Sequence, residues 1–495
     1  MGIVLAKTLG ELKKTPWRSR SVRVELRENL IAKMKNGEPL FPNIKGYEKS
    51  VEVQLVNAIL SLHDFILLGL RGQGKTKIIR LLSHFLDEHV PVLAGTSLNE
   101  DPYAPISPLG RRLVKEAGVE TPITWLTREE RFKEKLATPD VSIADLIGDI
   151  DPIKAAREKL DISNEEVIHW GLIPRSNRGI FAINELPDLQ PRIQVGLFNI
   201  LEERDIQVRG FPLRVPLDIL LVFSANPEDY TNRGRIITPL KDRIDSQIIT
   251  HYPKTIATAR AITLQEAQFN QTDFTIVDIL YDLIERVTFC ARKSEHVDQM
   301  SGVSQRLSIS LLESVLASAL QRGIKQGQSA PYHVRLMDIY GGLTAITGKI
   351  ELLEERNHEE LLNVSLSLIG EAIKEIFSEI FPALMYKKGK KQQRQRADDD
   401  HNINTAYAPI IDFFKAGNRL RIDDGLSDSA YLTELNKVPT LKKLALKHVP
   451  TKQVVSFYME LVLEGLYYHS FINREIKEGY VTYLDIYSTI LKGLV

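Results

Sequence analysis

A glycine-rich loop at residues 69–77 is the feature that most constrains what this chain can fold into. The sequence GLRGQGKTK follows the apolar run FILL and precedes the helical segment KIIRLLSHFL. It fits the pattern G-x-x-x-x-G-K-[ST], in which glycines let successive backbone N–H groups turn inward around phosphate oxygens. The helix that follows presents its positive end to the same anion. Packing alone does not require this composition, so the loop predicts a site for a nucleoside triphosphate.

Each residue type in the loop has an expected task in binding ATP and Mg²⁺, the two cofactors that the sequence predicts. Lys75 is expected to reach the β and γ phosphates, and the Thr76 hydroxyl is expected to hold Mg²⁺. The other loop residues expected to line the nucleotide site are Gly69, Arg71, Gly72, Gln73, Gly74 and Lys77.

Short apolar strands alternate with helical segments in the first half of the chain. Strands are predicted at 64–70, 91–96, 179–185 and 218–227. Each run is continuously apolar, and the spacing leaves room for a helix between runs, which is typical of a doubly wound parallel α/β sheet. Ligands of such sheets bind at the carboxyl ends of the strands, where the glycine-rich loop also lies.

The chain is predicted to contain five segments. Residues 1–40 form a basic N-terminal helical segment, interpreted as a solvated helix face or subunit contact in preference to a nucleic-acid site. After residue 254 the strand pattern stops, and apolar residues recur at helical spacing. The remaining segments are a nucleotide-binding domain at 41–254, a helical domain at 255–386, a charged linker at 387–402 and a C-terminal helical module at 403–495.

A second apolar strand ends in the pair Asn184-Glu185, where an Asp-Glu pair is usual in ATPases with this loop. Glu185 is the candidate base that polarises the attacking water. Asn184 is able to accept a hydrogen bond from a metal-bound water, but it brings no negative charge, so Mg²⁺ is expected to be held less tightly. The intact Glu185 favours an active ATPase; the alternative is a nucleotide-gated scaffold that scarcely hydrolyses ATP.

Three further polar residues follow at intervals that suit a catalytic set. Asn226 comes just after the third strand, where an amide is able to orient the attacking water. Arg243 is placed to face a neighbouring subunit and to supply positive charge to the transferring phosphoryl group in trans. Arg306 opens a helix of the second domain, from which it is expected to reach the nucleotide.

Composition excludes several classes of function. Lys+Arg and Asp+Glu balance at 64 each, so no global field favours nucleic acid or a membrane as partner. The single cysteine, Cys290, excludes an internal disulfide framework, and no apolar run approaches the roughly 20 residues that span a bilayer. The eleven histidines show no ligand spacing. We therefore expect a cytoplasmic protein with no metal site other than that for Mg²⁺.

Taken together, these motifs resemble the AAA+ ATPases of the MoxR and magnesium chelatase subunit I branch. The resemblance runs from FPNIKGYE to SQRLSIS, and it includes LIGDIDP with GLIPRSNRGIFAINE, and ILEERDIQVRGFPLRVPLDILLVFSANP. It implies a P-loop AAA+ core with an insert in the second helix and a hairpin before sensor 1, followed by an all-helical lid. It also implies a hexameric ring. The implied residues are Asn226 as sensor 1, Arg243 as arginine finger, Arg306 as sensor 2, and Ile44 and Gly46 near the adenine.

The resemblance implies a ring motor that hydrolyses ATP to remodel or activate a partner protein. Relatives of this kind usually serve a separate protein with a von Willebrand factor A domain, sometimes in metal insertion, and this chain has no D-x-S-x-S motif of its own. Asn184, residues 99–132 and the final hundred residues depart from the family. An AAA+ transcriptional or DNA-associated regulator is the other alternative, but the G-A-F-T-G-A loop is missing and no C-terminal recognition helix stands out.

Overall fold

The computed structural model divides the chain into two compact units, Met1–Tyr252 and Pro253–Val495, which are described separately. It describes residues 6–158, 167–208, 214–226, 235–354, 357–385, 403–448, 454–477 and 479–486. The predicted linker at 387–402 lies outside these residues. Within them, no helix combines the length and the apolar character that crossing a lipid bilayer requires.

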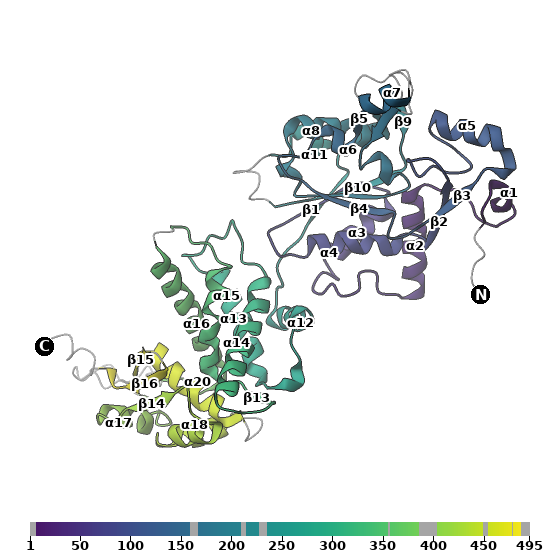
Figure 1. The fold of residues 1–495 in the computed structure, drawn as a ribbon. Helices are drawn as coiled ribbons and strands as arrows, with labels where there is room; N and C mark the ends of the chain where they lie inside the picture. Colours follow the sequence, from purple (N-terminus) through teal and green to yellow (C-terminus); the bar gives the residue numbers. More distant parts are fainter. Residues whose placement is uncertain are drawn as a thin grey trace, which may run out of the picture. The chain divides into compact units, whose positions relative to one another are not determined.

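A five-stranded parallel sheet forms the centre of the N-terminal unit (Figure 1). Its order is β11-β1-β10-β7-β4, so the first of these strands in the chain lies inside the sheet. Three of the strands correspond to predicted ones, and β1, β7 and β10 are almost wholly buried, as continuous apolar runs require. The strands are β1 (Phe65–Leu68), β4 (Phe132–Leu136), β7 (Gly179–Asn184), β10 (Ile219–Ala225) and β11 (Ser246–Ile249).

Helices cover both faces of this sheet, as the sequence predicts. Figure 1 shows α2, α3 and α4 on one side of the strands and α6, α8 and α11 on the other. Two separate apolar cores match these two layers, because alternate residues of each strand point to opposite faces. The helices are α2 (Val22–Asn36), α3 (Val51–Leu60), α4 (Lys75–Leu81), α6 (Ile143–Leu146), α8 (Pro191–Gly196), α9 (Phe198–Glu202) and α11 (Thr238–Arg243).

The N-terminal helix α2 packs one face into the core of this unit and leaves the opposite face exposed. Its first backbone N–H, at Val22, donates to Asp218 at 2.9 Å, just before β10 begins. Arg23 pairs with buried Asp64 at 2.6 Å, and buried Glu25 accepts two 2.6 Å hydrogen bonds from Arg131. The basic residues at the start of α2 thus neutralise carboxylates of the same chain, which charge pattern alone does not reveal.

The strand predicted at 91–96 exists, but it lies outside the central sheet. It is β2 (His89–Leu93), and it pairs antiparallel with β3 (Ile123–Thr127), with α5 (Pro108–Ala117) between them in sequence. The fifth place in the central sheet belongs instead to β4, which pairs parallel with β7. The strand β4 was not predicted because its sequence FKEKL has three charged residues between two apolar ones, whereas the predicted strands are all continuous apolar runs.

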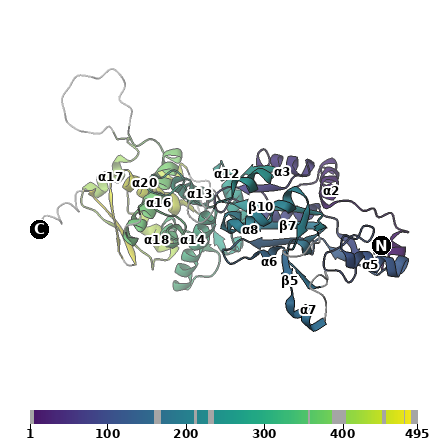
Figure 2. The same cartoon turned by 90° about the horizontal axis from the view of Figure 1, so that it is seen from above.

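Two short hairpins interrupt the helical layers of this unit. One pairs β5 (Gly148–Ile150) with β6 (Ile168–Trp170) and carries α7 (Pro152–Glu158), and Figure 2 shows it projecting away from the sheet. The other pairs β8 (Asp205–Gln207) with β9 (Arg214–Pro216) just before β10. These hairpins lie where the family resemblance implies the helix-2 insert and the pre-sensor-1 hairpin.

The C-terminal unit begins with a helical bundle, in agreement with the predicted lid. Its apolar core is formed along one face of each long helix. The principal helices are α12 (Ile256–Glu266), α13 (Asp278–Ala291), α14 (Arg306–Lys325), α15 (Leu343–Thr347) and α16 (His358–Ile380). A 3-10 helix, η7 (Leu336–Gly342), and the short pair β12 (Phe274–Thr275) and β13 (Tyr332–His333) connect them.

The C-terminal part of this unit is helical, as predicted, but it also contains a three-stranded antiparallel sheet. Its order is β14-β16-β15, with the first strand beside the last. Along the chain a helix and a strand come first, three helices follow, and a strand pair ends the described part of this module. The elements are α17 (Ala408–Lys415), β14 (Leu420–Asp423), α18 (Asp428–Leu435), α19 (Leu441–Leu446), α20 (Val455–Tyr468), β15 (Asn473–Lys477) and β16 (Tyr480–Leu484).

The helix α20 occupies the place of a recognition helix, directly before the strand pair, but it is buried. Residues 457–466 of this helix are buried without interruption, and α20 packs against α16 and α19. A helix that reads a DNA groove needs an exposed face along its length. The module therefore uses this helix as a core element.

Candidate functional site

The glycine-rich loop connects the end of β1 to the start of α4, in agreement with the predicted strand-loop-helix arrangement. Gly72 and Gly74 have φ values of 70° and 76°, in the left-handed region that favours glycine. A Cβ added at Gly74 would meet no atom within 4 Å, whereas one added at Gly69 would collide with the side chains of Thr250 and Gln73. The loop thus encloses a cradle of backbone groups on one side and packs tightly on the other.

Hydrogen bonds from two other segments fix the shape of this loop. The Tyr47 hydroxyl donates to the carbonyl of Gln73 at 2.8 Å, and burial raises the pKa of Tyr47 to about 12. The Thr250 hydroxyl donates to the Gln73 side chain at 2.6 Å, and the Tyr252 hydroxyl donates to the carbonyl of Arg71 at 2.9 Å. The loop is therefore held from the segment before α3 and from the segment after β11.

The segment before α3 contains Ile44 and Gly46, the two residues implied to lie near the adenine. Gly46 has a φ of 83°, and Ile44 packs partly buried against the core on the α2–α4 face of the sheet. The next residue, Tyr47, is the one that bonds the loop. The structure thus brings this segment to the loop, and the role of the two residues toward the base stays a prediction.

A chain of hydrogen bonds joins three of the predicted catalytic and phosphate-binding residues. The ammonium group of Lys75, which is 7% exposed, donates to the amide oxygen of Asn226 and to the carbonyls of Gly69 and Leu70. The amide nitrogen of Asn226 in turn donates to Glu185 Oε2 at 2.9 Å. The predicted cation, amide and base thus form one connected group.

The sheet order explains why these residues meet. β1, β10 and β7 are neighbours and run parallel, with Leu68 opposite Ala225 and Ile183 opposite Phe223. Their carboxyl ends therefore lie at the same edge of the sheet, and the residues just beyond them converge there. Glu185 turns sharply away from β7 with a φ of 57°. Backbone strain of this kind is found most often at functional sites.

Asn184 lies at the same edge but makes different contacts. It is 8% exposed; its amide oxygen accepts from the Ser224 hydroxyl at 3.1 Å, and its amide nitrogen faces Glu134 Oε2 at 3.5 Å. Ser224 also accepts a hydrogen bond from the backbone N–H of Glu185 at 3.3 Å. Sequence reasoning missed both Ser224 and Glu134. Recognition of FKEKL as the edge strand would have revealed Glu134, because it is the acidic residue of that strand.

The side chains around this edge suit Mg²⁺. The Thr76 hydroxyl lies in the exposed first turn of α4, and the neighbouring groups offer amide and carboxylate oxygens, the ligands that Mg²⁺ and its bound waters prefer. Among the described residues, no group of three or more His, Cys, Asp or Glu side chains is placed to hold another metal ion. Lys77 is half-buried in the same turn, and Arg71 is exposed on the loop.

The two predicted arginines are not brought to the loop within the N-terminal unit. Arg243 ends α11, where it donates to Glu202 at 2.8 Å and to the carbonyl of Pro239 at 2.9 Å, above the ring of Phe198. Arg306 is the exposed first residue of α14 and belongs to the C-terminal unit. The predicted roles of both arginines toward a nucleotide stay predictions.

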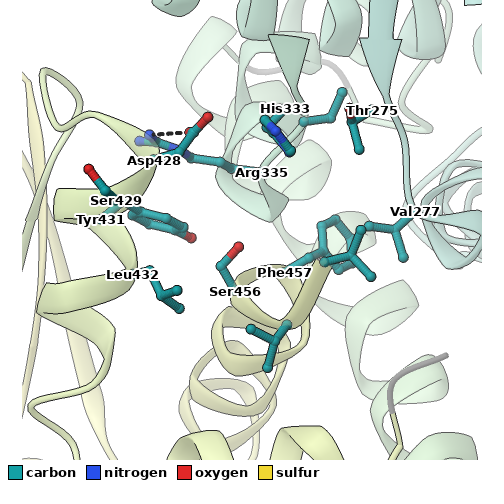
Figure 3. Close-up of a pocket in the computed structure, with 13 residues that line it drawn as sticks. Thr275, Val277, His333, Arg335, Asp428, Ser429, Tyr431, Leu432, Ser456 and Phe457 are labelled. Carbon is teal, nitrogen blue, oxygen red and sulfur yellow. Dashed lines mark hydrogen bonds and ion pairs between the residues drawn. The ribbon is translucent and has the colours of Figure 1, made fainter. Parts of the chain in front are cut away.

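A cavity of about 230 Å³ in the C-terminal unit contains none of the predicted site residues (Figure 3). It lies between the β12–β13 pair, α18 and the start of α20, and its walls are mixed polar and apolar. Arg335 is its principal cation, and Figure 3 shows that this arginine is already paired with Asp428, at 3.0 Å. The cavity is therefore separate from the predicted nucleotide site, and its cation is paired with a carboxylate of the same unit.

Comparison with known proteins gives limited similarity in sequence. No protein-family model matches the chain. The hydrogenase transcriptional regulatory protein HoxA of Cupriavidus necator is 31% identical over 87 residues, which are 17% of this chain. The chain spans 18% of the length of that relative.

Solved structures that match include a complex of the magnesium chelatase subunits BchI and BchD, based on a single-particle cryo-EM reconstruction. The matched chain is 18% identical, covers 65% of this chain and 98% of its own, and has a TM-score of 0.34. A variant of RuvB from Thermotoga maritima is 11% identical, covers 67% of this chain and 74% of its own, and has a TM-score of 0.33.

The order of the strands defines the fold class of the N-terminal unit. The glycine-rich loop follows the central strand β1, the Asn184-Glu185 pair follows β7, and Asn226 follows β10 between them. A helical bundle comes next in the chain. The chain therefore has the fold of an AAA+ P-loop ATPase, a parallel sheet between helical layers followed by a helical C-terminal part.

Proposed function

We propose that this chain is an ATP-hydrolysing AAA+ motor that assembles into a ring and remodels or activates a partner protein. The observation that carries this proposal is the hydrogen-bonded chain from Lys75 through Asn226 to Glu185. A protein that only packs its core has no need for a cation, an amide and a base at the edge where parallel sheets bind ligands.

The residues of the chain divide the work of hydrolysis. Lys75 and the backbone N–H groups of the loop hold the β and γ phosphates, and Thr76 takes part in binding Mg²⁺, which neutralises the charge that develops on the phosphoryl oxygens. Glu185 accepts the proton of the attacking water. Asn226 orients that water and keeps Glu185 in register with Lys75, because its amide bonds to both side chains.

The position of Arg243 supports the proposed assembly into a ring. Its guanidinium is 29% exposed and pairs with Glu202, an exposed side chain, near the surface of the unit. From such a position an arginine is able to face the nucleotide of a neighbouring subunit in a hexamer and act in trans. Arg306 at the start of α14 is proposed to act as sensor 2 on the nucleotide bound by its own chain.

The partner is proposed from the sequence resemblance to the MoxR and magnesium chelatase subunit I branch. We infer a separate protein with a von Willebrand factor A domain, met in the cytoplasm, with metal insertion as one way of using the motor. Capture of partners by a Glu185→Gln variant in the presence of ATP tests this, because a stalled motor retains its client. The matched control is the same variant in ADP.

A nucleotide-gated scaffold is the second candidate, and Asn184 is the observation that favours it. Its neutral amide replaces a carboxylate, which weakens support for Mg²⁺. A DNA-associated regulator has less support: α20, in the place of a recognition helix, is buried. Both alternatives predict that the chain binds ATP, so hydrolysis has to be measured directly.

The deciding experiment compares steady-state ATP hydrolysis of wild type and Glu185→Gln, with nucleotide affinity measured beside it. Loss of the base is expected to lower turnover at least about 100-fold, as general-base removal does, with ATP affinity changed little. Glu203→Gln, a nearby exposed carboxylate, serves as the control and is expected to behave as wild type. A wild type that binds ATP but turns over no faster than Glu185→Gln would support the scaffold instead.

A further inference from the structure

The geometry points to Glu134 as the carboxylate that supports Mg²⁺ at the sheet edge, in place of the charge that Asn184 lacks. This inference rests on the proposed function, because it assigns a positioning residue to the same site. In this chain the negative charge lies on the edge strand β4, whereas ATPases with this loop usually have an aspartate at the end of the strand that corresponds to β7.

The strand register places Glu134 beside Asn184. β4 and β7 pair parallel with Leu136 opposite Asn184 and Glu134 opposite Ala182. Residues opposite each other, and those two positions away, point to the same face of a sheet. Glu134 and Asn184 therefore share the face covered by α4, the helix that follows the glycine-rich loop. The 3.5 Å contact between Glu134 Oε2 and the Asn184 amide nitrogen joins them.

This contact also fixes how the Asn184 amide is oriented. An ionised carboxylate only accepts hydrogen bonds, so the NH₂ end of the amide has to face Glu134. The amide oxygen then points to Ser224, from which it accepts a hydrogen bond at 3.1 Å. Asn184 thus bridges two strands, and Glu134 is the neighbouring group that carries a negative charge.

The partner of Glu134 on α4 is Arg80, which shares a helix face with the expected metal ligand Thr76. Arg80 donates to Glu134 Oε1 from Nε at 3.1 Å and also from Nη2. Thr76 lies one helical turn before Arg80, and residues four apart on a helix share a face. Arg80 Nε also lies 3.2 Å from Glu134 Oε2, so both carboxylate oxygens face this arginine. The Arg80 side chain is 61% exposed, so solvent screens the ion pair, and a water bound to Mg²⁺ has only this screened partner to displace.

The same arrangement explains why an asparagine is suited to position 184. An aspartate there would lie about 3.5 Å from the Glu134 carboxylate, and two like charges so close disfavour ionisation of both. Besides Glu185, this part of the site therefore accommodates one carboxylate, on either β4 or β7. This reasoning predicts that the charge can be returned to β7 if it is removed from β4.

The test measures the affinity of a fluorescent ATP analogue in Mg²⁺ and in EDTA. The ratio of the two affinities is the Mg²⁺ enhancement. Glu134→Gln is expected to lower the Mg²⁺ enhancement about ten-fold, because one charged partner of the metal's bound water is lost. The exchanged variant, Glu134→Gln with Asn184→Asp, is expected to recover it to within about three-fold of wild type. Glu129→Gln, an exposed carboxylate just before β4, is the control and should not change the ratio.

Two outcomes would overturn the inference without touching the proposed function. One is a wild-type ratio in a folded Glu134→Gln variant, and the other is a lowered ratio that the exchanged variant fails to recover. If Glu134→Gln does not fold, Arg80→Ala tests the same inference. This variant removes the cation that competes for the Glu134 carboxylate, so the Mg²⁺ enhancement should rise; a lower ratio in Arg80→Ala would contradict the inference. A wild type that binds no nucleotide in either condition would overturn both.

Discussion

Carboxylates at the edge of the central sheet are partly exposed, whereas the carboxylates on α20 are fully buried, and their partners differ as well. At the sheet edge, Glu185 meets the neutral amide of Asn226, and Glu134 meets an exposed arginine. On α20, fully buried Glu464 accepts hydrogen bonds from Arg474, from Tyr340 at 2.9 Å and from Tyr483 at 2.7 Å. The sheet-edge carboxylates keep hydrogen-bonding capacity for a ligand, whereas Glu464 on α20 is hydrogen-bonded by donors of its own chain.

In this molecule, the partners of a carboxylate indicate whether it contributes to packing or to ligand binding. A carboxylate that is saturated by donors of its own chain contributes to the packing of the C-terminal unit, where it joins α20 to η7 and to the strand pair. A carboxylate held by neutral or solvent-screened partners is available for chemistry. Substitutions around the α20 carboxylates should therefore change unfolding, and those around the sheet-edge carboxylates should change nucleotide binding.

The largest effect is expected where a buried ion pair is broken. Arg474→Met leaves the charge of Glu464 buried without its cation; the two side chains are 6% and 0% exposed. The free energy of unfolding of the C-terminal unit should fall by about 3–5 kcal/mol. Scanning calorimetry measures it, with Arg421→Met as control, because that arginine lies on the same sheet but is 59% exposed. Equal unfolding temperatures for the two variants would contradict a structural role for the Arg474–Glu464 ion pair.

The next effect depends on pH and comes from Glu460, the other buried carboxylate of α20. Burial raises the pKa of Glu460 to about 7, with Glu464 and Asp338 adding to the rise and Tyr431 and Arg335 opposing it. A carboxyl group whose pKa is raised by folding contributes its full stability below pH 4.5 and loses it as the pH rises through 7. The free energy of unfolding should therefore fall by roughly 3 kcal/mol between pH 5 and pH 8 from this group.

Glu460→Gln checks this expectation, because a glutamine has no proton to lose. Urea unfolding followed by circular dichroism, at several pH values, should give a flatter dependence on pH for the variant than for wild type. Parallel curves for the two proteins would mean that Glu460 does not titrate in this range.

The smallest of the three effects in free energy lies at the nucleotide site. Lys75→Ala removes the buried cation that faces the phosphates, and ATP should bind about 100-fold more weakly, which is about 2.7 kcal/mol. Titration calorimetry measures the affinity, and Lys49→Ala, an exposed lysine before α3, is the control. Unchanged affinity, or a loss of unfolding temperature as large as that of Arg474→Met, would contradict the division between the two sets.

Much of the nucleotide site was predictable from sequence because its chemistry lies at strand ends. Continuous apolar runs located β1, β7 and β10, and parallel pairing then required that Lys75, Glu185 and Asn226 converge. Glu134 was not predictable in this way. Its strand lies at the edge of the sheet and has three charged residues in succession, so neither apolar continuity nor spacing from the loop identifies it.

In the C-terminal part, much less of the structure was predictable from sequence. The two buried glutamates of α20, Glu460 and Glu464, suggest a polar face when they are read alone. Their partners, Arg474 and η7, are brought to them only by tertiary packing. The strands β14, β15 and β16 are short, and alternating residues mark them only weakly in a region that reads as helical.

The central position of β1 has a consequence for how the protein is made. Its partners on either side are β10 and β11, and Leu68 pairs with Ile249, so the strand that leads directly into the phosphate loop emerges from the ribosome roughly 180 residues before its neighbourhood is complete. At 5–20 residues per second, this apolar segment waits on the order of ten seconds or more with both edges unpaired. During this interval the segment is exposed to chaperones, and slower translation of the intervening residues lengthens the exposure.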